Sequence, residues 1–278
     1  MLRTRLITAL IAFPFAAGVI FAGGLWFLVT VTLIALIAGW EFSQMMKKGG
    51  YRVTPFFTLG LIVLLILDSY RSDLNLRCIL SLILLLSLTW QLFRNDTKTP
   101  VADWALTLAG GLYIGWGMAH LVALRQLGDG LAWIWLTLSS TWAADSFAYF
   151  AGRTLGRHKL WPRHSPKKTW EGLIGSIGGG LLGAALVVAL FPSLGWSTAL
   201  TIGAIAPIIG LFGDLSISMM KRQVGVKDTS NLFPGHGGFL DRADSVLFVS
   251  VVVYYYALWS GAFGGVGFVL WNLGLSSF

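Results

Sequence analysis

The chain has 278 residues, of which 56% are hydrophobic and 12% are charged, and its mean hydropathy is +0.74. An average soluble domain has roughly 25% charged residues, so this composition excludes a soluble enzyme and indicates a protein embedded in a membrane. The net charge of +8 is weak evidence for nucleic-acid binding, because bases at the cytoplasmic ends of membrane spans produce the same excess.

Cysteine and histidine usage limits the kinds of metal site. The single cysteine, Cys78, excludes an intramolecular disulfide and a thiolate cluster, and its apolar surroundings predict a buried side chain. The four histidines are scattered and lack the spacing of a histidine metal site. Any metal ion is therefore expected to have oxygen ligands.

The apolar runs predict an all-α, polytopic integral membrane protein with about nine transmembrane helices. In chain order the expected spans are residues 6–22, 25–42, 55–70, 76–93, 102–124, 131–151, 171–192, 198–220 and 244–261. The first run is interpreted as part of a helical hairpin and not as a cleaved leader, because the apolar character resumes directly after Gly24.

The lysines and arginines predict the orientation of these spans. With nine spans and a cytoplasmic N-terminus, all but three of the 20 bases face the cytoplasm. The exceptions are Arg71, Arg77 and Arg125. An eight-span arrangement would scramble this asymmetry, so we expect nine spans.

The span at 171–192 contains a run of glycines. Gly175, Gly179 and Gly183 are four residues apart, which predicts close packing against a neighbouring helix. A dinucleotide-binding fold is excluded because no strand precedes the run.

Two long loops on the expected cytoplasmic side, residues 153–169 and 221–240, are predicted to form one site. Asp214, Ser218 and Lys221 share one face of the helix that leads into the second loop. Asp241 and Asp244 share a face at the start of the next helix. Carboxylates beside a bilayer are costly unless they face one another, a cation or water, so a functional site is expected here.

Two helices that present carboxylates to each other suit Mg²⁺, which binds through one or two carboxylates and substrate phosphates. Nearby bases would offset phosphate charge, and the glycine turn at 235–238 lets backbone amides approach an anion closely. Simpler explanations remain open: Asp214 could form a structural ion pair, Asp241 and Asp244 could cap a helix, and His236 could be an ordinary loop residue.

The order and gaps of these residues resemble a known family signature. Two blocks carry it: Ser218-x-x-Lys221-Arg222-x-x-x-x-Lys227-Asp228 and Pro234-x-His236-Gly237-Gly238-x-x-Asp241-Arg242-x-Asp244. They closely resemble the signature of phosphatidate cytidylyltransferases, also called CDP-diacylglycerol synthases. Upstream segments at 145–153 and 165–172 look like the same family.

The resemblance implies transfer of a cytidylyl group from CTP to phosphatidate, which yields CDP-diacylglycerol and pyrophosphate in phospholipid biosynthesis. It implies Mg²⁺ as cofactor, with Asp214 and Asp241 as the metal ligands. Whether a second metal ion binds is left open. The expected catalytic residues are Lys221, Arg222, Lys227, Asp228, His236, Arg242 and Asp244. The expected substrate-binding residues are Asp145, Ser165, Lys167, Lys168, Thr169, Glu171, Ser218, Gly237 and Gly238.

The resemblance also implies a bacterial cytoplasmic (inner) membrane with the site on its cytoplasmic side. We expect residues 1–130 to form a scaffold with lipid contacts, or contacts in a homodimer, and residues 131–278 to form the catalytic region. No nucleic-acid partner is expected.

Other functions remain open. A related cytidylyltransferase that acts on another lipid phosphate would carry the same motifs. An ion-coupled transporter would also place acids in spans, but it predicts inverted repeats and charges near the bilayer midplane. CDP-alcohol phosphotransferases carry an Asp-Gly-x-x-Ala-Arg pattern that is missing from this sequence.

Overall fold

A computed structural model describes residues 13–71, 75–230 and 237–262 of the chain. Its elements are the helix Phe13–Ala22, α2 (Gly24–Lys48), α3 (Pro55–Tyr70), α4 (Leu76–Leu92), α5 (Pro100–Gln126), α6 (Gly130–Thr154), β1 (Lys159–Trp161), β2 (Ser165–Thr169), α7 (Trp170–Leu190), the short 3-10 helix η1 (Pro192–Leu194), α8 (Trp196–Gln223) and α9 (Leu240–Ala262). Over the residues that the structure describes, each expected span coincides with a helix, although the first span is described only from Phe13, so the all-α fold class is confirmed.

Within the described ranges, five helices are long and apolar enough to cross a membrane: α2, α5, α7, α8 and the Leu240–Ser260 part of α9. The chain is therefore an all-α integral membrane protein. The helix Phe13–Ala22, α3 and α4 are shorter, and the serines, threonines and tryptophans of α6 lower its hydropathy. Nine crossings remain a prediction.

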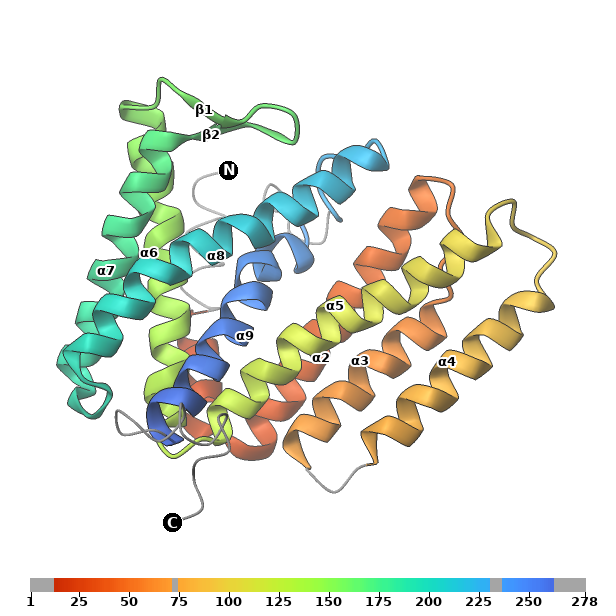
Figure 1. The fold of residues 1–278 in the computed structure, drawn as a ribbon, viewed down its shortest axis with the longest axis horizontal. Coiled ribbons are helices and arrows are strands. Elements are labelled where there is room, and N and C mark those ends of the chain that lie inside the picture. Colours follow the sequence, from red (N-terminus) through yellow and green to blue (C-terminus); the bar gives the residue numbers. More distant parts are fainter. Residues whose placement is uncertain (1–12, 72–74, 231–236, 263–278) are drawn as a thin grey trace, which may run out of the picture.

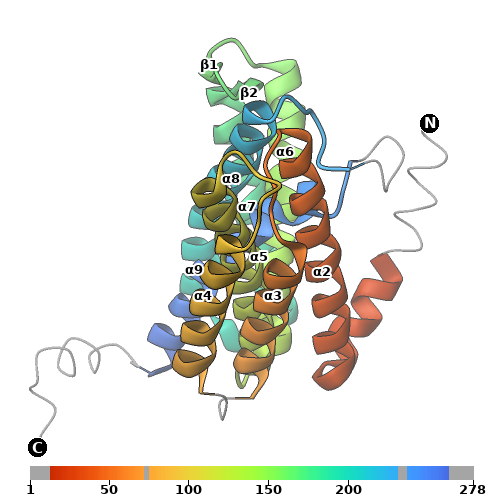
Figure 2. The same cartoon turned by 90° about the vertical axis from the view of Figure 1, so that its right-hand side faces the viewer.

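Consecutive long helices run in alternating directions, so the loops gather at two ends of the molecule (Figure 1). The loops at 49–54 and 93–99, the β1–β2 hairpin and the end of α8 lie at one end. The loop at 127–129 and η1 lie at the opposite end (Figures 1 and 2). Apart from Arg3 and Arg5, which lie outside the described residues, the bases that the sequence assigned to the cytoplasmic side belong to the elements of the first end.

The helices form two packed groups that meet along α5 and α9. In one group, α7 packs between α6 and α8, and α8 also packs against α9 (Figure 1). In the other group, α3 packs against both α2 and α5. Helix α4 is outermost and buries only Ser87 and Gln91. Cys78 lies on α4 and is exposed, so the prediction that it is buried is wrong. An apolar run does not reveal which helix of a bundle is peripheral.

Local sequence signals explain where several helices begin. Pro55 and Pro100 occupy the first turns of α3 and α5, where a missing backbone N–H costs no helical hydrogen bond. Thr169 caps α7, because its hydroxyl accepts a hydrogen bond from the Gly172 backbone N–H at 3.1 Å.

The glycine run of α7 packs against α6, as the sequence predicts. A Cβ atom at Gly179 would lie 2.6 Å from the Ala143 carbonyl oxygen, and one at Gly183 would collide with the Ser139 carbonyl. A Cβ at Gly175 would collide with Ala151. The absence of side chains at these positions therefore lets the two helix backbones come close together.

The loop after α6 contains the only β-structure in the described part of the chain. Strands β1 and β2 pair antiparallel, with Lys159 opposite Thr169 and Trp161 opposite Ser165. The sequence predicts a plain loop here and no strand before the glycine run of α7; both expectations are wrong, because neither strand is long enough to show a two-residue alternation of polar and apolar residues. This hairpin carries Lys167 and Lys168 to the upper end of the bundle (Figure 1).

Candidate active site

A cavity of about 410 Å³ lies between α6, α7, α8, α9 and the β1–β2 hairpin. Its floor is apolar, with Leu173, Pro207 and Leu211. The charged residues in its lining are Asp145, Lys167, Lys168, Asp214, Lys221, Asp241 and Asp244. Four aspartates and three lysines therefore line one cavity, at the end of the bundle where most of the described bases are found.

Helix α8 contributes one side of the cavity through a single helical face. The Ser218 hydroxyl donates to Asp214 Oδ1 at 3.2 Å, and Asp214 and Lys221 both line the cavity. The predicted shared face of Asp214, Ser218 and Lys221 is confirmed. Arg222, one residue further along, is exposed and donates to the Val226 carbonyl at 3.3 Å.

The hairpin and α8 are connected by an ion pair across the cavity. Lys168 Nζ lies 2.6 Å from Asp214 Oδ2, and the side chains are 24% and 36% exposed. This pair matches the simpler explanation of Asp214 as a structural ion-pair partner. It also places an ammonium group in the cavity, so the hairpin forms part of the cavity lining.

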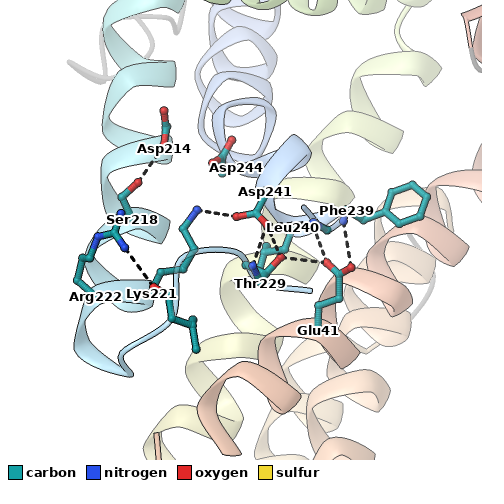
Figure 3. Close-up of polar contacts among 12 residues, drawn as sticks. Glu41, Asp214, Ser218, Lys221, Arg222, Thr229, Phe239, Leu240, Asp241 and Asp244 are labelled. Carbon is teal, nitrogen blue, oxygen red and sulfur yellow. Dashed lines mark hydrogen bonds and ion pairs between the residues drawn. The ribbon is translucent and has the colours of Figure 1, made fainter. Parts of the chain in front are cut away.

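Asp241, in the first turn of α9, is held by four donors. Lys221 Nζ lies 2.6 Å from its Oδ1 atom. Its Oδ2 atom accepts hydrogen bonds from the Thr229 backbone N–H and hydroxyl at 2.8 Å each, and from the Gly238 N–H at 3.0 Å (Figure 3). Both side chains of the Lys221–Asp241 pair are 11% exposed, so this pair is nearly buried.

Asp244 lies one turn further along α9 and is buried. Its Oδ1 accepts a hydrogen bond from the Ser245 backbone N–H at 2.7 Å. A Cβ atom at Gly213 of α8 would collide with the Asp244 carbonyl oxygen, so the two helices nearly touch at this point. In Figure 3 the carboxylates of Asp214 and Asp244 both face the space between α8 and α9.

The donor set fits a hard divalent cation that also binds substrate. In the described ranges, no three acidic, histidine or cysteine side chains form a cluster that would hold a metal ion by themselves. Mg²⁺ commonly binds through one or two protein carboxylates, with phosphate oxygens and water completing its shell. The carboxylates of the cavity supply that kind of ligand, whereas the described histidines lie outside the cavity.

The structure brings together only part of the predicted site. The predicted residues that line the cavity are Asp145, Ser165, Lys167, Lys168, Thr169, Asp214, Lys221, Asp241 and Asp244. Those outside its lining are Glu171, Ser218, Arg222, Lys227, Asp228, Gly237, Gly238 and Arg242. His236 lies outside the described residues.

Two predicted substrate-binding segments have partners within the protein. Glu171 accepts a hydrogen bond from His158 Nδ1 at 2.6 Å and from the His158 backbone N–H at 3.2 Å, which fastens the hairpin to α7. Gly237 has a φ of +75°, and a Cβ there would lie 2.6 Å from Asp241 Oδ2. In the described part of the glycine turn, the backbone therefore packs against the carboxylate of Asp241.

Sequence reasoning missed Glu41 and Thr229. Glu41 lies near the end of α2 and accepts hydrogen bonds from residues almost 200 positions away, including the Leu240 N–H at 2.9 Å. The sequence did contain a signal for Glu41, because an acid at the edge of an apolar run requires a hydrogen-bond or ion-pair partner. Thr229 carries no comparable signal in the sequence.

Comparisons with known proteins indicate the same family that the sequence motifs resemble. The model of the cytidylyltransferase family matches residues 3–260. The chain is similar to a phosphatidate cytidylyltransferase of Synechocystis sp., at 33% identity over 91% of this chain and 96% of the relative. It is similar to those of Bacillus subtilis, at 33% identity over 91% and 97%, and Pseudomonas aeruginosa, at 33% identity over 95% and 99%. The similarity thus includes the N-terminal helices, where the sequence shows no motif.

Proposed function

Since the chain belongs to the cytidylyltransferase family, we propose that it transfers a cytidylyl group from CTP to phosphatidate, forming CDP-diacylglycerol and pyrophosphate. The observation that carries this proposal is the cavity in which three lysines and four aspartates converge at one end of the helical bundle. A lipid phosphate and a soluble nucleotide can both reach such a position, because it lies at the end of membrane-embedded helices.

The reaction requires positioning more than covalent catalysis. An oxygen of the lipid phosphate attacks the α-phosphorus of CTP, the bond to the β-phosphate breaks, and pyrophosphate leaves. Both substrates are anions, so their approach depends on neutralisation by bases and cations. A phosphate monoester is already nucleophilic, and no covalent enzyme intermediate is needed.

We propose that Lys167 and Lys168 of the hairpin and Lys221 of α8 bind substrate phosphates. In the substrate-free protein, Lys168 and Lys221 are paired with Asp214 and Asp241. Phosphate groups compete for these ammonium groups, and the exchange frees the carboxylates to bind a cation. Ser165 and Thr169 flank the lysines on the hairpin and are proposed to contact the nucleotide.

Asp214 and Asp241 are the proposed Mg²⁺ ligands. A divalent ion bound there would neutralise the phosphates and polarise the bond that breaks. Asp145 and Asp244 are proposed to orient water molecules or substrate groups beside them. The four aspartates in the cavity lining support a cation site, because Mg²⁺ binds through carboxylate oxygens together with substrate phosphates.

We further propose nine spans, a cytoplasmic N-terminus and a cytoplasmic active site in the inner membrane of a bacterium. The grouping of bases at the cavity end supports this orientation. Cys78, the only cysteine and an exposed one, would then lie on the outer side. A membrane-impermeant thiol reagent should label Cys78 in intact cells, whereas a Lys227→Cys variant lacking Cys78 should react only after permeabilisation. The reverse pattern would invert the topology.

The activity is tested with purified protein in detergent, radiolabelled CTP, Mg²⁺ and phosphatidate. A radiolabelled CDP-lipid should form, and phosphatidate should be preferred over other lipid phosphates. Asp214→Asn should abolish turnover, whereas Asp129→Asn, at the opposite end of the bundle, should not. Absence of product with every lipid phosphate would overturn the enzymatic proposal; product from a different lipid phosphate alone would change its substrate.

A further inference from the structure

Glu41 of α2 is a buried acid far from the signature in the sequence. Its relative exposure is 4%, and no lysine or arginine in the described ranges forms an ion pair with it. A buried carboxylate is costly unless hydrogen bonds replace its hydration. The groups that supply those hydrogen bonds therefore indicate what Glu41 does.

All of the described hydrogen-bond donors to Glu41 come from the segment between α8 and α9 or from the first residue of α9. Its Oε1 atom accepts from the Ser230 hydroxyl at 2.5 Å and the Phe239 N–H at 3.1 Å. Its Oε2 atom accepts from the Leu240 N–H at 2.9 Å (Figure 3). The N–H groups at the start of a helix lack intrahelical partners and favour a negative charge. Glu41 thus caps α9 from another helix.

The glycine next to this cap has no room for a side chain. A Cβ atom at Gly238 would collide with both carboxylate oxygens of Glu41 and with the Thr229 hydroxyl. Gly238 belongs to the signature turn, where the sequence suggested an approach to a phosphate. In the structure, the anions that this backbone approaches are the carboxylates of Glu41 and Asp241.

A short path of contacts leads from this cap to the cavity. The Thr229 hydroxyl lies 3.4 Å from Glu41 Oε2 and 2.8 Å from Asp241 Oδ2. The Thr229 and Gly238 N–H groups also hold Asp241 Oδ2, which leaves Oδ1 facing Lys221. The donors that orient Asp241 are thus in the segment that Glu41 fastens, as Figure 3 shows.

We propose that Glu41 is a positioning residue for the transfer reaction. It fixes residues 229–230 and 238–240 so that Asp241 and Lys221 present their charged atoms to the cavity. Glu41 touches neither substrate, because it is absent from the cavity lining. This inference rests on the proposed function, and it gives the N-terminal helices a part in the active site beyond that of a scaffold.

Glu41→Gln tests the inference with the smallest change in volume. The amide keeps one acceptor but turns an NH₂ group toward N–H or hydroxyl donors. Because the variant loses hydrogen bonds that were made to a charged carboxylate, kcat should fall about 10- to 100-fold. KM for CTP should change by less than about threefold, since groups that bind the nucleotide remain. Trypsin should also cleave faster after Lys227, because this exposed residue lies two positions before Thr229, which Glu41 no longer holds.

Asp103→Asn is the matched control. Asp103 is another fully buried acid with neutral donors, among them the Arg52 backbone N–H at 2.8 Å, but those donors are not residues that hold Asp241. Its variant should lower the thermal midpoint while kcat, measured well below that midpoint, and cleavage after Lys227 stay unchanged. If Asp103→Asn and Glu41→Gln lower kcat and the thermal midpoint in parallel, Glu41 has only a structural role and the inference is wrong.

Ser230→Ala covers the case in which Glu41→Gln does not fold. It removes one donor to Glu41 and leaves the acid in place, so kcat should fall about two- to tenfold with KM retained. Unchanged kcat in this variant, or in a folded Glu41→Gln variant, overturns the inference. If the unmodified protein makes no CDP-lipid at all, the proposed function fails instead, and the cleavage assay still reports whether Glu41 fastens the segment.

Discussion

Replacing Gly213 with alanine tests whether the close approach of α8 and α9 sets the geometry of the active site. Gly213 precedes Asp214 and faces the backbone of Asp244. An added methyl group would collide with the Asp244 carbonyl oxygen, and would lie 3.0 Å from its carbonyl carbon and 3.2 Å from Phe248 Cδ2. Carbon atoms in good contact are about 3.5–4.0 Å apart, so the helices must separate by roughly 0.5–1 Å.

The expected effect on stability is modest, whereas the effect on activity is large. Overpacking costs about 1–3 kcal/mol, and alanine regains about 1 kcal/mol of helix propensity relative to glycine. The free energy of unfolding should therefore fall by about 0–2 kcal/mol. A shift of about 1 Å between groups that must act together can reduce the rate about 100-fold, and the shift here separates Asp214 from Asp244.

The assay compares Gly213→Ala with Gly178→Ala in the same detergent. Gly178 lies in α7, and nothing is within 4 Å of the Cβ position there, so this control should retain kcat and be slightly more stable. CDP-lipid formation at saturating substrate gives kcat, and a detergent unfolding titration gives stability. If Gly213→Ala retains kcat within about twofold while remaining folded, close helix contact does not set the site geometry, and the reasoning fails.

Three further predictions concern the charged groups of the cavity. Lys221→Met leaves the nearly buried Asp241 without its cation, so unfolding free energy should fall by about 3 kcal/mol and turnover should be lost; an equally stable variant would contradict this. Lys168→Met should change stability by only about 0–1 kcal/mol, because its pair with Asp214 is partly exposed, but should raise KM for CTP about tenfold. Unchanged KM would exclude Lys168 from nucleotide binding. Chelation with EDTA should stop CDP-lipid formation and excess Mg²⁺ should restore it; full activity in EDTA would remove the metal proposal.

Much of the fold follows from the sequence because the underlying causes are local. Apolar runs long enough to span a bilayer form helices wherever they lie in the chain, and the expected spans coincide with helices in the described ranges. Asp214, Ser218 and Lys221 share a face because their spacing matches the helical repeat. The close packing predicted from the glycines of α7 is confirmed, because residues without side chains let two helix backbones approach each other closely.

The partner of each charged group, in contrast, depended on contacts between distant segments. The sequence contains no local pattern that assigns Lys168 to Asp214 or Glu41 to the start of α9; their partners follow from how the hairpin and α2 lie against α8 and α9. The exposure of Cys78 was decided in the same way, by the peripheral place of α4. Spacing along one helix is set by backbone geometry, but a pairing between helices is set by the packing of the whole bundle, so only the tertiary structure could decide it.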